Sequence, residues 1–335
     1  MMKELLSKAV SGTDLTTAEV TQAMDMIMQG DATPAQIAGF ITALRMKGET
    51  VEEVTGAAAS MRRHATYIDA GAQTVVDTCG TGGDGANTFN ISTTTAFVVA
   101  GAGISVAKHG NRAVSSQCGS ADVLAALGIQ IDVDPYVMEQ SLQENGIGFL
   151  FAPKMHPAMK YAIGPRRELG YRTVFNMLGP LTNPAGATGQ VLGVFAPELT
   201  EMFANVLNGL GTRRAFVVHG NDGLDEITCT GPTRVSELRD GIVRTYEISA
   251  DMLLGDSFDI EEIAGGDPDE NARILRAILD GQPGACRAVV LLNAAAAIVA
   301  GEKADRLEDG LRIAAESIDS GAAKGKLQAL IDATH

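Results

Sequence analysis

The chain has 335 residues, of which 45% are hydrophobic and 20% charged, and its formal net charge is −15. At roughly 150 residues per domain, this length predicts two domains or one large one. The apolar content is sufficient for a sizeable core and excludes an intrinsically disordered chain. The negative charge and the absence of Trp argue against binding to nucleic acid or to an anionic membrane surface.

The four cysteines are widely spaced and form no C-x-x-C pair: Cys79, Cys118, Cys229 and Cys286. Such spacing is typical neither of a zinc site nor of a small disulfide-rich secreted domain, so we expect reduced thiols. The first residues lack the apolar stretch of a signal peptide, and the longest apolar runs, 95–107 and 288–300, are too short to span a bilayer. The expected protein is soluble and cytoplasmic.

The first 70 residues are predicted to form a small helical bundle. Apolar residues recur there at helical spacing, and Pro34 suits the first turn of a helix. Thr50 is followed three residues later by Glu53, which is the arrangement of a capping box. Gly30 and Gly48 are expected to end two of the helices.

From Gly71 onward, short β-branched runs alternate with helical patterns. Strands are predicted at 74–77, 104–107, 129–133, 147–151, 190–195 and 214–218, with helices at 88–101, 120–127, 135–145 and 197–210. This alternation predicts a mostly parallel sheet flanked by helices. Asp240-Gly241 lies between two alternating runs and predicts a hairpin. Helices dominate again from residue 268 onward.

The expected fold class is therefore α/β, with a small N-terminal helical domain and a larger α/β domain. We assign residues 1–70 to the first domain, and residues 71–164 and 188–335 to the second. Residues 165–187 interrupt the alternation with a helical and then Pro/Gly-rich stretch. We expect that stretch to pack on the helical domain.

A glycine-rich segment follows the first predicted strand and leads into a helix, with glycines at 80, 82, 83 and 85. Backbone N–H groups and a helix N-terminus in this order favour binding of a phosphate or pyrophosphate group. The spacing matches neither G-x-G-x-x-G nor G-x-x-x-x-G-K-[ST]. A tight strand–helix turn without a ligand explains the glycines alone equally well. The nearby polar residues Asp84, Asn90, Ser92 and Thr93 favour the phosphate site.

A second polar loop, beginning Lys108-His-Gly-Asn-Arg, follows the second predicted strand. The carboxyl ends of parallel strands share one edge of a sheet, so this loop should lie near the glycines. Lys108 and Arg112 would add positive charge, and Ser115 and Ser116 would add hydroxyl donors. The alternative is ordinary surface charge, and His109 alone is more often structural than catalytic.

Two further charged pairs have possible functions. Asp225 and Glu226 follow the strand predicted at 214–218, and adjacent carboxylates at that edge suit Mg²⁺, which prefers oxygen ligands. A solvated acidic loop is the alternative. Arg166 and Arg167 could recognise a substrate carboxylate through a bidentate fork, or form a surface salt bridge with Glu168.

Taken together, these segments resemble the anthranilate phosphoribosyltransferase family over nearly the whole chain. The matching pieces are Ala43 to Thr50, Gly80 to Asp84, Asn90 to Thr93, Lys108 to Arg112, Gly119 to Asp122, Arg172 to Pro184 and Gly223 to Glu226. The resemblance implies a homodimer formed through the helical part. It also implies transfer of phosphoribose from phosphoribosyl pyrophosphate (PRPP) to the amino group of anthranilate, in tryptophan biosynthesis.

The resemblance also implies roles for particular residues. It implies that Mg²⁺ is held by Ser92, Asp225 and Glu226, and that anthranilate contacts Gly80, Asn111, Arg166, Gly179 and Pro180. The residues implied to hold PRPP are Gly80, Gly83, Asp84, Thr88, Asn90, Ile91, Ser92, Thr93, Lys108, His109, Gly110, Asn111, Arg112, Ala113, Val114, Ser115, Ser116 and Ser120.

No general base is required, because the amine of anthranilate is already a usable nucleophile, and His109 is only a weak candidate. Positioning and electrostatic stabilisation would supply most of the rate. Two other functions remain open from the sequence. One is a pyrimidine nucleoside phosphorylase of related fold, and the other is a non-enzymatic relative that binds nucleic acid.

Overall fold

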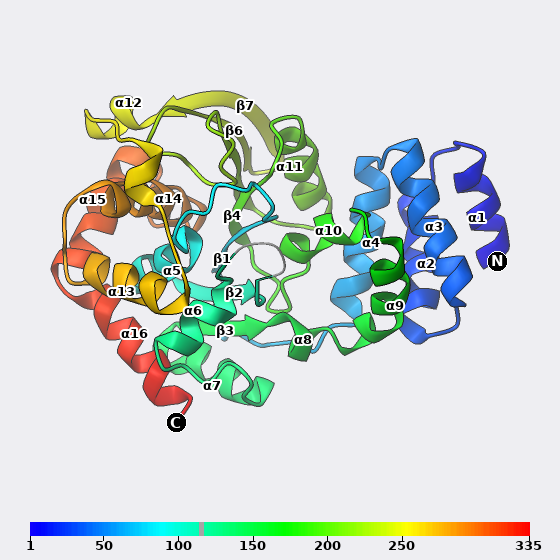
Figure 1. The fold of residues 1–335 in the computed structure, drawn as a ribbon, viewed down its shortest axis with the longest axis horizontal. Helices are drawn as coiled ribbons and strands as arrows, with labels where there is room; N and C mark the ends of the chain where they lie inside the picture. Colours follow the sequence, from blue (N-terminus) through cyan, green and yellow to red (C-terminus); the bar gives the residue numbers. More distant parts are fainter. Residues whose placement is uncertain (114–116) are drawn as a thin grey trace.

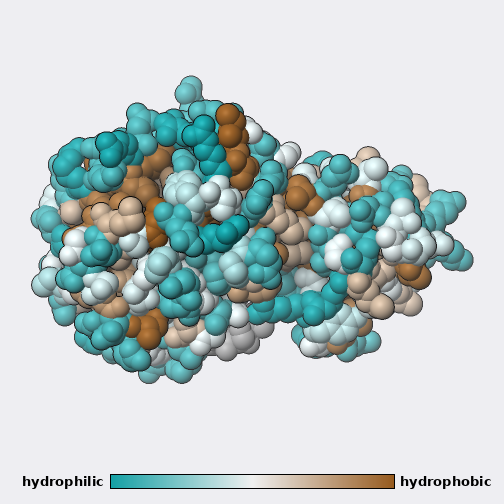
Figure 2. Space-filling model, turned by 90° about the horizontal axis from the view of Figure 1, so that it is seen from above, coloured by the Kyte–Doolittle hydropathy of each residue, from teal (hydrophilic) through white to brown (hydrophobic). Residues whose placement is uncertain are grey.

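A computed structural model describes residues 1–113 and 117–335. Figure 2 shows a large lobe and a small lobe joined by a narrower waist, and the N-terminal helices form the small lobe in Figure 1. Among the described residues, no helix combines the length and the apolar character needed to cross a membrane.

The small lobe contains α1 (Met2–Val10), α2 (Thr17–Gln29), α3 (Pro34–Lys47) and α4 (Val51–Arg63). Each of the last three follows a threonine N-cap whose hydroxyl accepts a backbone N–H, within a complete capping box. The predicted capping box of Thr50 and Glu53 is confirmed, as are the helix ends at Gly30 and Gly48. The apolar faces of these helices meet around Ile27, Phe40 and Leu44, none of which is exposed.

The large lobe is built on a single seven-stranded sheet in the order β3-β2-β1-β4-β5-β6-β7. The strands are β1 (Val75–Gly80), β2 (Ser105–Gly110), β3 (Ile147–Phe151), β4 (Gly189–Gly193), β5 (Arg214–Gly220), β6 (Pro232–Arg239) and β7 (Ile242–Ser249). The first five strands pair in parallel and the last two antiparallel. The predicted mostly parallel sheet is therefore confirmed. The predicted hairpin is confirmed too, with positive φ at Asp240 and Gly241.

Each face of the sheet is covered by different helices. One face packs against α5 (Ile91–Gly101) and α14 (Ala285–Ala300), behind which lie α15 (Leu307–Asp319) and α16 (Ala322–Ala333). The other face packs against α11 (Leu199–Gly209), which also contacts α4 of the small lobe. The apolar core on this second face is therefore continuous with the core of the helical bundle.

The remaining helices connect these layers or cover the end of the sheet near β3. They are α6 (Ser120–Ala126), α7 (Pro135–Asn145), α8 (Ala152–Met155), α9 (Lys160–Leu169), α10 (Phe175–Leu178), α12 (Ala250–Leu254) and α13 (Pro268–Leu279). Short 3₁₀ turns lie at Pro157–Met159, Gly179–Leu181 and Ile260–Ile263. Helix α9 packs on α3, and α10 packs on α4.

The strand predicted at 129–133 is wrong. This stretch is a turn between α6 and α7, and it pairs with no described strand. Its alternation of apolar residues arises because Ile129 and Ile131 are both buried in the core around the connection. The backbone of Gln130 is held by the hydroxyl of Thr334 rather than by a neighbouring strand.

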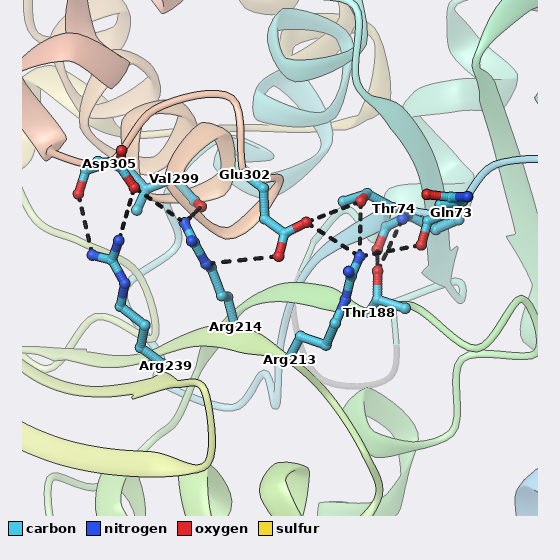
Figure 3. Close-up of polar contacts among 10 residues, drawn as sticks. Gln73, Thr74, Thr188, Arg213, Arg214, Arg239, Val299, Glu302 and Asp305 are labelled. Carbon is cyan, nitrogen blue, oxygen red and sulfur yellow. Dashed lines mark hydrogen bonds and ion pairs between the residues drawn. The ribbon is translucent and has the colours of Figure 1, made fainter.

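At the amino end of the strands, a row of arginines ties the sheet to the turn after α14 (Figure 3). Arg213 and Arg214 at the start of β5 face Glu302, at 3.3 and 3.8 Å. Arg239 at the end of β6 donates to Asp305 at 2.8 Å. This network closes the edge of the sheet opposite to the polar loops.

A partly buried arginine links the two lobes. Arg62 near the end of α4 donates from Nε to the carbonyl of Leu181 at 2.7 Å and from Nη1 to that of Leu210 at 3.4 Å. Burial lowers the pKa of Arg62 to about 10, although Asp77 opposes this shift. The guanidinium thus satisfies the carbonyl of Leu181 in the connecting segment and that of Leu210 at the end of α11 in the large lobe.

We expect Arg62→Met to lower the free energy of unfolding by about 1–3 kcal/mol, because it leaves partly buried carbonyls without a donor. The matched control is Arg63→Met, which removes an exposed ion pair to Asp25 at 2.8 Å and should cost less than about 1 kcal/mol. Urea unfolding of both variants measures the difference. Equal losses would show that Arg62 does not anchor the lobes.

Candidate functional site

The polar loops at the carboxyl ends of the parallel strands surround one cleft of about 740 Å³. Its lining comes from the ends of β1 and β2, the start of α5, the loop after β5 and the connection after α9. The predicted residues that line it are Gly80, Gly83, Asp84, Thr88, Asn90, Ile91, Ser92, Thr93, Lys108, His109, Gly110, Asn111, Arg112, Ala113, Ser120, Arg166, Asp225 and Glu226.

Two predicted residues that the structure describes are not part of this lining. Gly179 and Pro180 do not line the cleft; the carbonyl of Gly179 lies 3.2 Å from Nδ1 of His109, and that of Pro180 accepts from Gln190. Val114, Ser115 and Ser116 lie outside the described residues.

The glycine-rich segment is shaped by its approach to Asp225. The N–H of Gly82 donates to Oδ2 of Asp225 at 2.7 Å. Gly82, Gly83 and Gly85 all have positive φ, a conformation that other residues rarely adopt. At Gly80, a side chain would collide with the Asp225 carboxylate. The glycines therefore allow the backbone to wrap closely around a buried acidic group.

Asp225 and Glu226 are only 9% and 8% exposed. Burial, followed by the charge of Asp84, raises the pKa of Asp225 to about 7. Burial and the neighbouring Asp225 raise the pKa of Glu226 well above its usual value, against the opposing effect of Lys108. Buried carboxylates gathered in this way create a site that a cation would stabilise.

The donor set fits Mg²⁺ better than a metal that requires a full protein cage. The described residues contain no group of three or more His, Cys, Asp and Glu side chains gathered to hold a metal. Mg²⁺ is usually bound through one or two carboxylates, with water and substrate phosphates completing its shell. Ser92 is close to the carboxylates, because its N–H donates to Glu226.

Lys108 lines the cleft, but its side chain is buried and its amine is bonded to the protein. Its Nζ donates to the carbonyl of Thr78 at 2.6 Å and to Oγ of Ser92 at 3.3 Å. Burial lowers its pKa, while Asp77 and Glu226 act in the opposite direction. Lys108 therefore places a buried positive charge beside Ser92, opposite the carboxylates.

A buried polar network supports the second loop from below. Asp77 on β1 accepts from Nδ2 of Asn183 at 2.7 Å and from the N–H of His109 at 3.2 Å. Asn183 also donates to the carbonyl of Ala107 at 2.7 Å. Sequence reasoning did not find this network, because its members are far apart in the chain.

His109 is paired with a second histidine. The Nε2 atoms of His109 and His156 lie 3.2 Å apart. Burial lowers the pKa of His109 to about 3, with His156 contributing, and burial lowers the pKa of His156 to about 4. Both rings are therefore neutral near pH 7, and His109 is a weak base.

Arg166 lines the cleft from α9, the helix that packs on α3 of the helical lobe. Its guanidinium lies 5.1 Å from the centre of the Phe175 ring, and burial lowers its pKa. Among the described residues, no carboxylate pairs with it, so the alternative salt bridge to Glu168 is not formed. Arg112 differs, because it pairs with Asp122 at 2.8 Å.

The cleft also contains residues to which the sequence assigned no role. Tyr171, Arg172, Asn176 and Phe195 all line it. The first three lie in the connection between the lobes, within or beside the motif that begins at Arg172. That motif was the available signal, but nothing in it indicated which side chains face the cleft.

Comparisons with known proteins agree over the full chain. Residues 3–65 match the glycosyl transferase family, helical bundle domain, and residues 72–324 match the glycosyl transferase family, a/b domain. The anthranilate phosphoribosyltransferase of Desulfatibacillum aliphaticivorans is 59% identical over 100% of this chain and 99% of its own. That of Desulfosudis oleivorans is 61% identical, again over 100% of this chain and 99% of its own.

Solved structures show the same similarity. The anthranilate phosphoribosyltransferase of Thermus thermophilus is 40% identical, with a TM-score of 0.94 over 98% of this chain and 99% of its own. The Saccharomyces cerevisiae enzyme in complex with PRPP and Mg is 30% identical, with a TM-score of 0.89 over 99% of this chain and 97% of its own.

The histidine pair predicts a pH dependence of stability. An unfolded histidine binds a proton near pH 6.5, whereas His109 and His156 stay neutral in the fold until about pH 3 and 4. The unfolded state thus binds more protons below pH 6.5, and stability should fall as the pH falls, by up to about 1.4 kcal/mol per unit for each histidine.

Urea unfolding between pH 7.5 and 5.5 measures this slope, and subtracting the slope of His156→Gln isolates the contribution of His156 from other titrating groups. We expect the variant to lose less stability than the parent chain over this interval. Identical slopes would contradict the lowered pKa values.

Proposed function

The chain belongs to the anthranilate phosphoribosyltransferase family, and on that premise we propose that this cleft transfers the phosphoribosyl group of PRPP to the amino group of anthranilate. Pyrophosphate is the second product, and the pathway is tryptophan biosynthesis. The observation that carries the assignment is the separation of charge along the cleft. Buried carboxylates line it at the end of the sheet, and Arg166, which pairs with no carboxylate among the described residues, lines it from α9 beside the helical lobe.

PRPP would occupy the part of the cleft between the glycine-rich segment and the second loop. The glycines expose backbone N–H groups to its phosphate oxygens, and the start of α5 adds the partial positive charge of a helix N-terminus. The role of Lys108 becomes indirect, because its Nζ is bonded to Thr78 and Ser92. Contacts from Val114, Ser115 and Ser116 remain a prediction.

Mg²⁺ would be held by Asp225, Glu226 and Ser92, together with oxygens of PRPP. When bound, it would neutralise the charge that develops on the departing pyrophosphate. The burial of the two carboxylates, and the raised pKa values that result, support a cation at this position. The complex of the yeast relative with PRPP and Mg also supports it.

Anthranilate would lie at the opposite end, with its carboxylate toward Arg166 and its amine toward the ribose. An arginine without a carboxylate partner can form a bidentate pair with a benzoate group. Asn111 and Gly80 line the same cleft. Contacts through Gly179 and Pro180 remain a prediction. A yeast relative of 28% identity has been solved in complex with 4-fluoroanthranilate, which supports this class of ligand.

The reaction breaks the bond between the ribose anomeric carbon and a pyrophosphate oxygen, and forms a bond from that carbon to the anthranilate nitrogen. The nitrogen then releases one proton. Because His109 is neutral and weakly basic, positioning of the two substrates and stabilisation of charge would provide most of the rate. No described feature favours the nucleoside phosphorylase or the nucleic-acid-binding alternative over this reaction.

We also propose a cytoplasmic homodimer that associates through the helical lobe. Apolar atoms lie on the visible surface of the small lobe in Figure 2. Large apolar side chains are exposed on α1, α3 and α9, including Val10, Met46 and Ile163. The proposed domains are residues 1–70 with 165–187, and residues 71–164 with 188–335. The packing of α9 on α3 supports this division.

Replacing Arg166 tests the orientation of anthranilate. We expect Arg166→Ala to raise the KM for anthranilate at least about 30-fold, because losing a buried charged partner costs about 2–5 kcal/mol. The KM for PRPP should change much less. The KM of Arg166→Lys for anthranilate should fall between those of the parent chain and of Arg166→Ala. Steady-state kinetics that follow loss of anthranilate fluorescence measure this. Equal effects on both substrates would give Arg166 a structural role instead.

Replacing the acidic pair tests the metal site. Asp225→Asn with Glu226→Gln keeps shape but removes two charges, so the Mg²⁺ concentration for half-maximal rate should rise steeply and kcat should fall. The melting temperature without ligand should stay level or rise, because repulsion between buried carboxylates is relieved. The matched control is Glu308→Gln with Asp309→Asn, an exposed adjacent pair on α15. A Mg²⁺ dependence like that of the control would withdraw the metal assignment.

A further inference from the structure

One side chain from the connection between the lobes reaches the glycine-rich segment. Nη2 of Arg172 donates to the carbonyl of Gly83 at 3.1 Å. The same guanidinium lies 4.2 Å from the centre of the Phe195 ring, just beyond the end of β4. Phe195 is itself joined to the glycine segment, because its N–H donates to Oγ1 of Thr81 at 3.1 Å.

The backbone around Arg172 is held from the other side by α3. The carbonyl of Arg172 accepts from Nη1 of Arg45 at 2.6 Å. The hydroxyls of Tyr171 and Thr42 share a hydrogen bond of 2.6 Å, and the Arg45 guanidinium lies 5.7 Å from the Tyr171 ring centre. Residues 171 and 172 therefore contact the helical lobe and the phosphate-binding segment at the same time.

The glycine segment has no regular structure of its own and is otherwise bonded to the rest of the protein at Thr81, Gly82 and Asn87. Residues 81–87 belong to no helix or strand. Ordering a residue costs about 1–2 kcal/mol of backbone entropy, and glycine loses more freedom than any other residue. A Cβ at Gly83 would displace the Arg172 guanidinium, and the positive φ of Gly83 independently favours glycine. Both the backbone of Gly83 and the side chain of Arg172 therefore contribute to this contact.

We propose that Arg172 is a positioning residue that holds the glycine segment in its anion-binding conformation and couples that conformation to α3. The inference rests on the proposed function of the cleft, and it adds a role for a residue that acts through the loop rather than through PRPP. Its stacking on Phe195 and its bond to Gly83 direct the guanidinium at the loop. The bond from Arg45 fixes the backbone from which the side chain extends.

The test compares Arg172→Met, which keeps an apolar chain over Phe195 but has no donor, with Arg172→Lys, which keeps one donor. The matched control is Arg276→Met, because Nη2 of Arg276 also donates to a single carbonyl, that of Leu127, at 3.1 Å outside the cleft. Hydrogen–deuterium exchange of residues 80–88 in the ligand-free protein reports the loop directly. Steady-state kinetics report KM for each substrate and kcat.

For Arg172→Met we expect exchange in the loop to be about tenfold faster and the KM for PRPP to rise about tenfold. The KM for anthranilate should remain within about twofold, a split that general destabilisation would not produce. Loop exchange and the KM for PRPP should both change less in Arg172→Lys than in Arg172→Met, and neither should change in Arg276→Met. The exchange rate should also rise in Arg45→Met, although Arg45 does not contact the loop.

Two outcomes would overturn the inference. A raised KM for PRPP with unchanged exchange in the loop would mean that Arg172 contacts PRPP directly. No change in either quantity would make Arg172 an ordinary surface residue. Failure of the proposed function would look different from failure of this inference. In the first case the parent chain would not consume anthranilate with PRPP and Mg²⁺, while hydrogen–deuterium exchange in the ligand-free protein would still test the loop.

Discussion

Two carboxylates are buried at the end of a parallel sheet, and the surrounding structure is arranged to tolerate them. Removing charge from water is expensive unless hydrogen bonds or opposite charges compensate. Asp225 receives an N–H from Gly82, Glu226 receives one from Ser92, and Lys108 supplies a buried positive charge nearby. Raised pKa values show that this compensation is incomplete in the protein alone. A bound cation would complete it, so the free energy of binding a metal would offset the cost of burying these two carboxylates.

The parallel topology explains why these groups meet. Strands β1, β2, β4 and β5 run in the same direction, so the segments that follow them emerge at one edge. Glycines at the ends of β1 and β4 then allow the backbone of residue 225 to approach closely. The opposite edge is closed by the arginine row of Figure 3 and is not available for the same purpose. The direction of the strands therefore determines which edge can bind a ligand.

Much of this could be predicted from the sequence where the signal is local. The capping box of Thr50, the hairpin at Asp240 and the strands of the parallel sheet depend on neighbouring residues, and the structure confirms them. The strand predicted at 129–133 is wrong, because two buried residues in a turn, Ile129 and Ile131, produce the same alternation of apolar and polar residues as a strand. Lys108 is in the expected place, but its amine points to Thr78, a contact between strands that spacing cannot reveal. Likewise, the bond between Arg172 and Gly83 joins residues 89 positions apart.

The distribution of charge along the cleft restricts the chemistry it can favour. A neutral histidine pair and a buried lysine leave no strong base in the middle, where bond exchange would occur. The buried carboxylates lie instead at the end of the sheet and Arg166 lies on α9, where a pyrophosphate and a carboxylate would be held. Such a site can accelerate a reaction whose nucleophile needs no activation, by fixing the distance between two substrates and stabilising the leaving group. Because the carboxylate end is formed by the sheet and the Arg166 end by the connection to the helical lobe, that distance depends on how the two lobes are held together. The contacts of Arg62 and Arg172 lie across this junction, so they would help to set the distance between the two substrates.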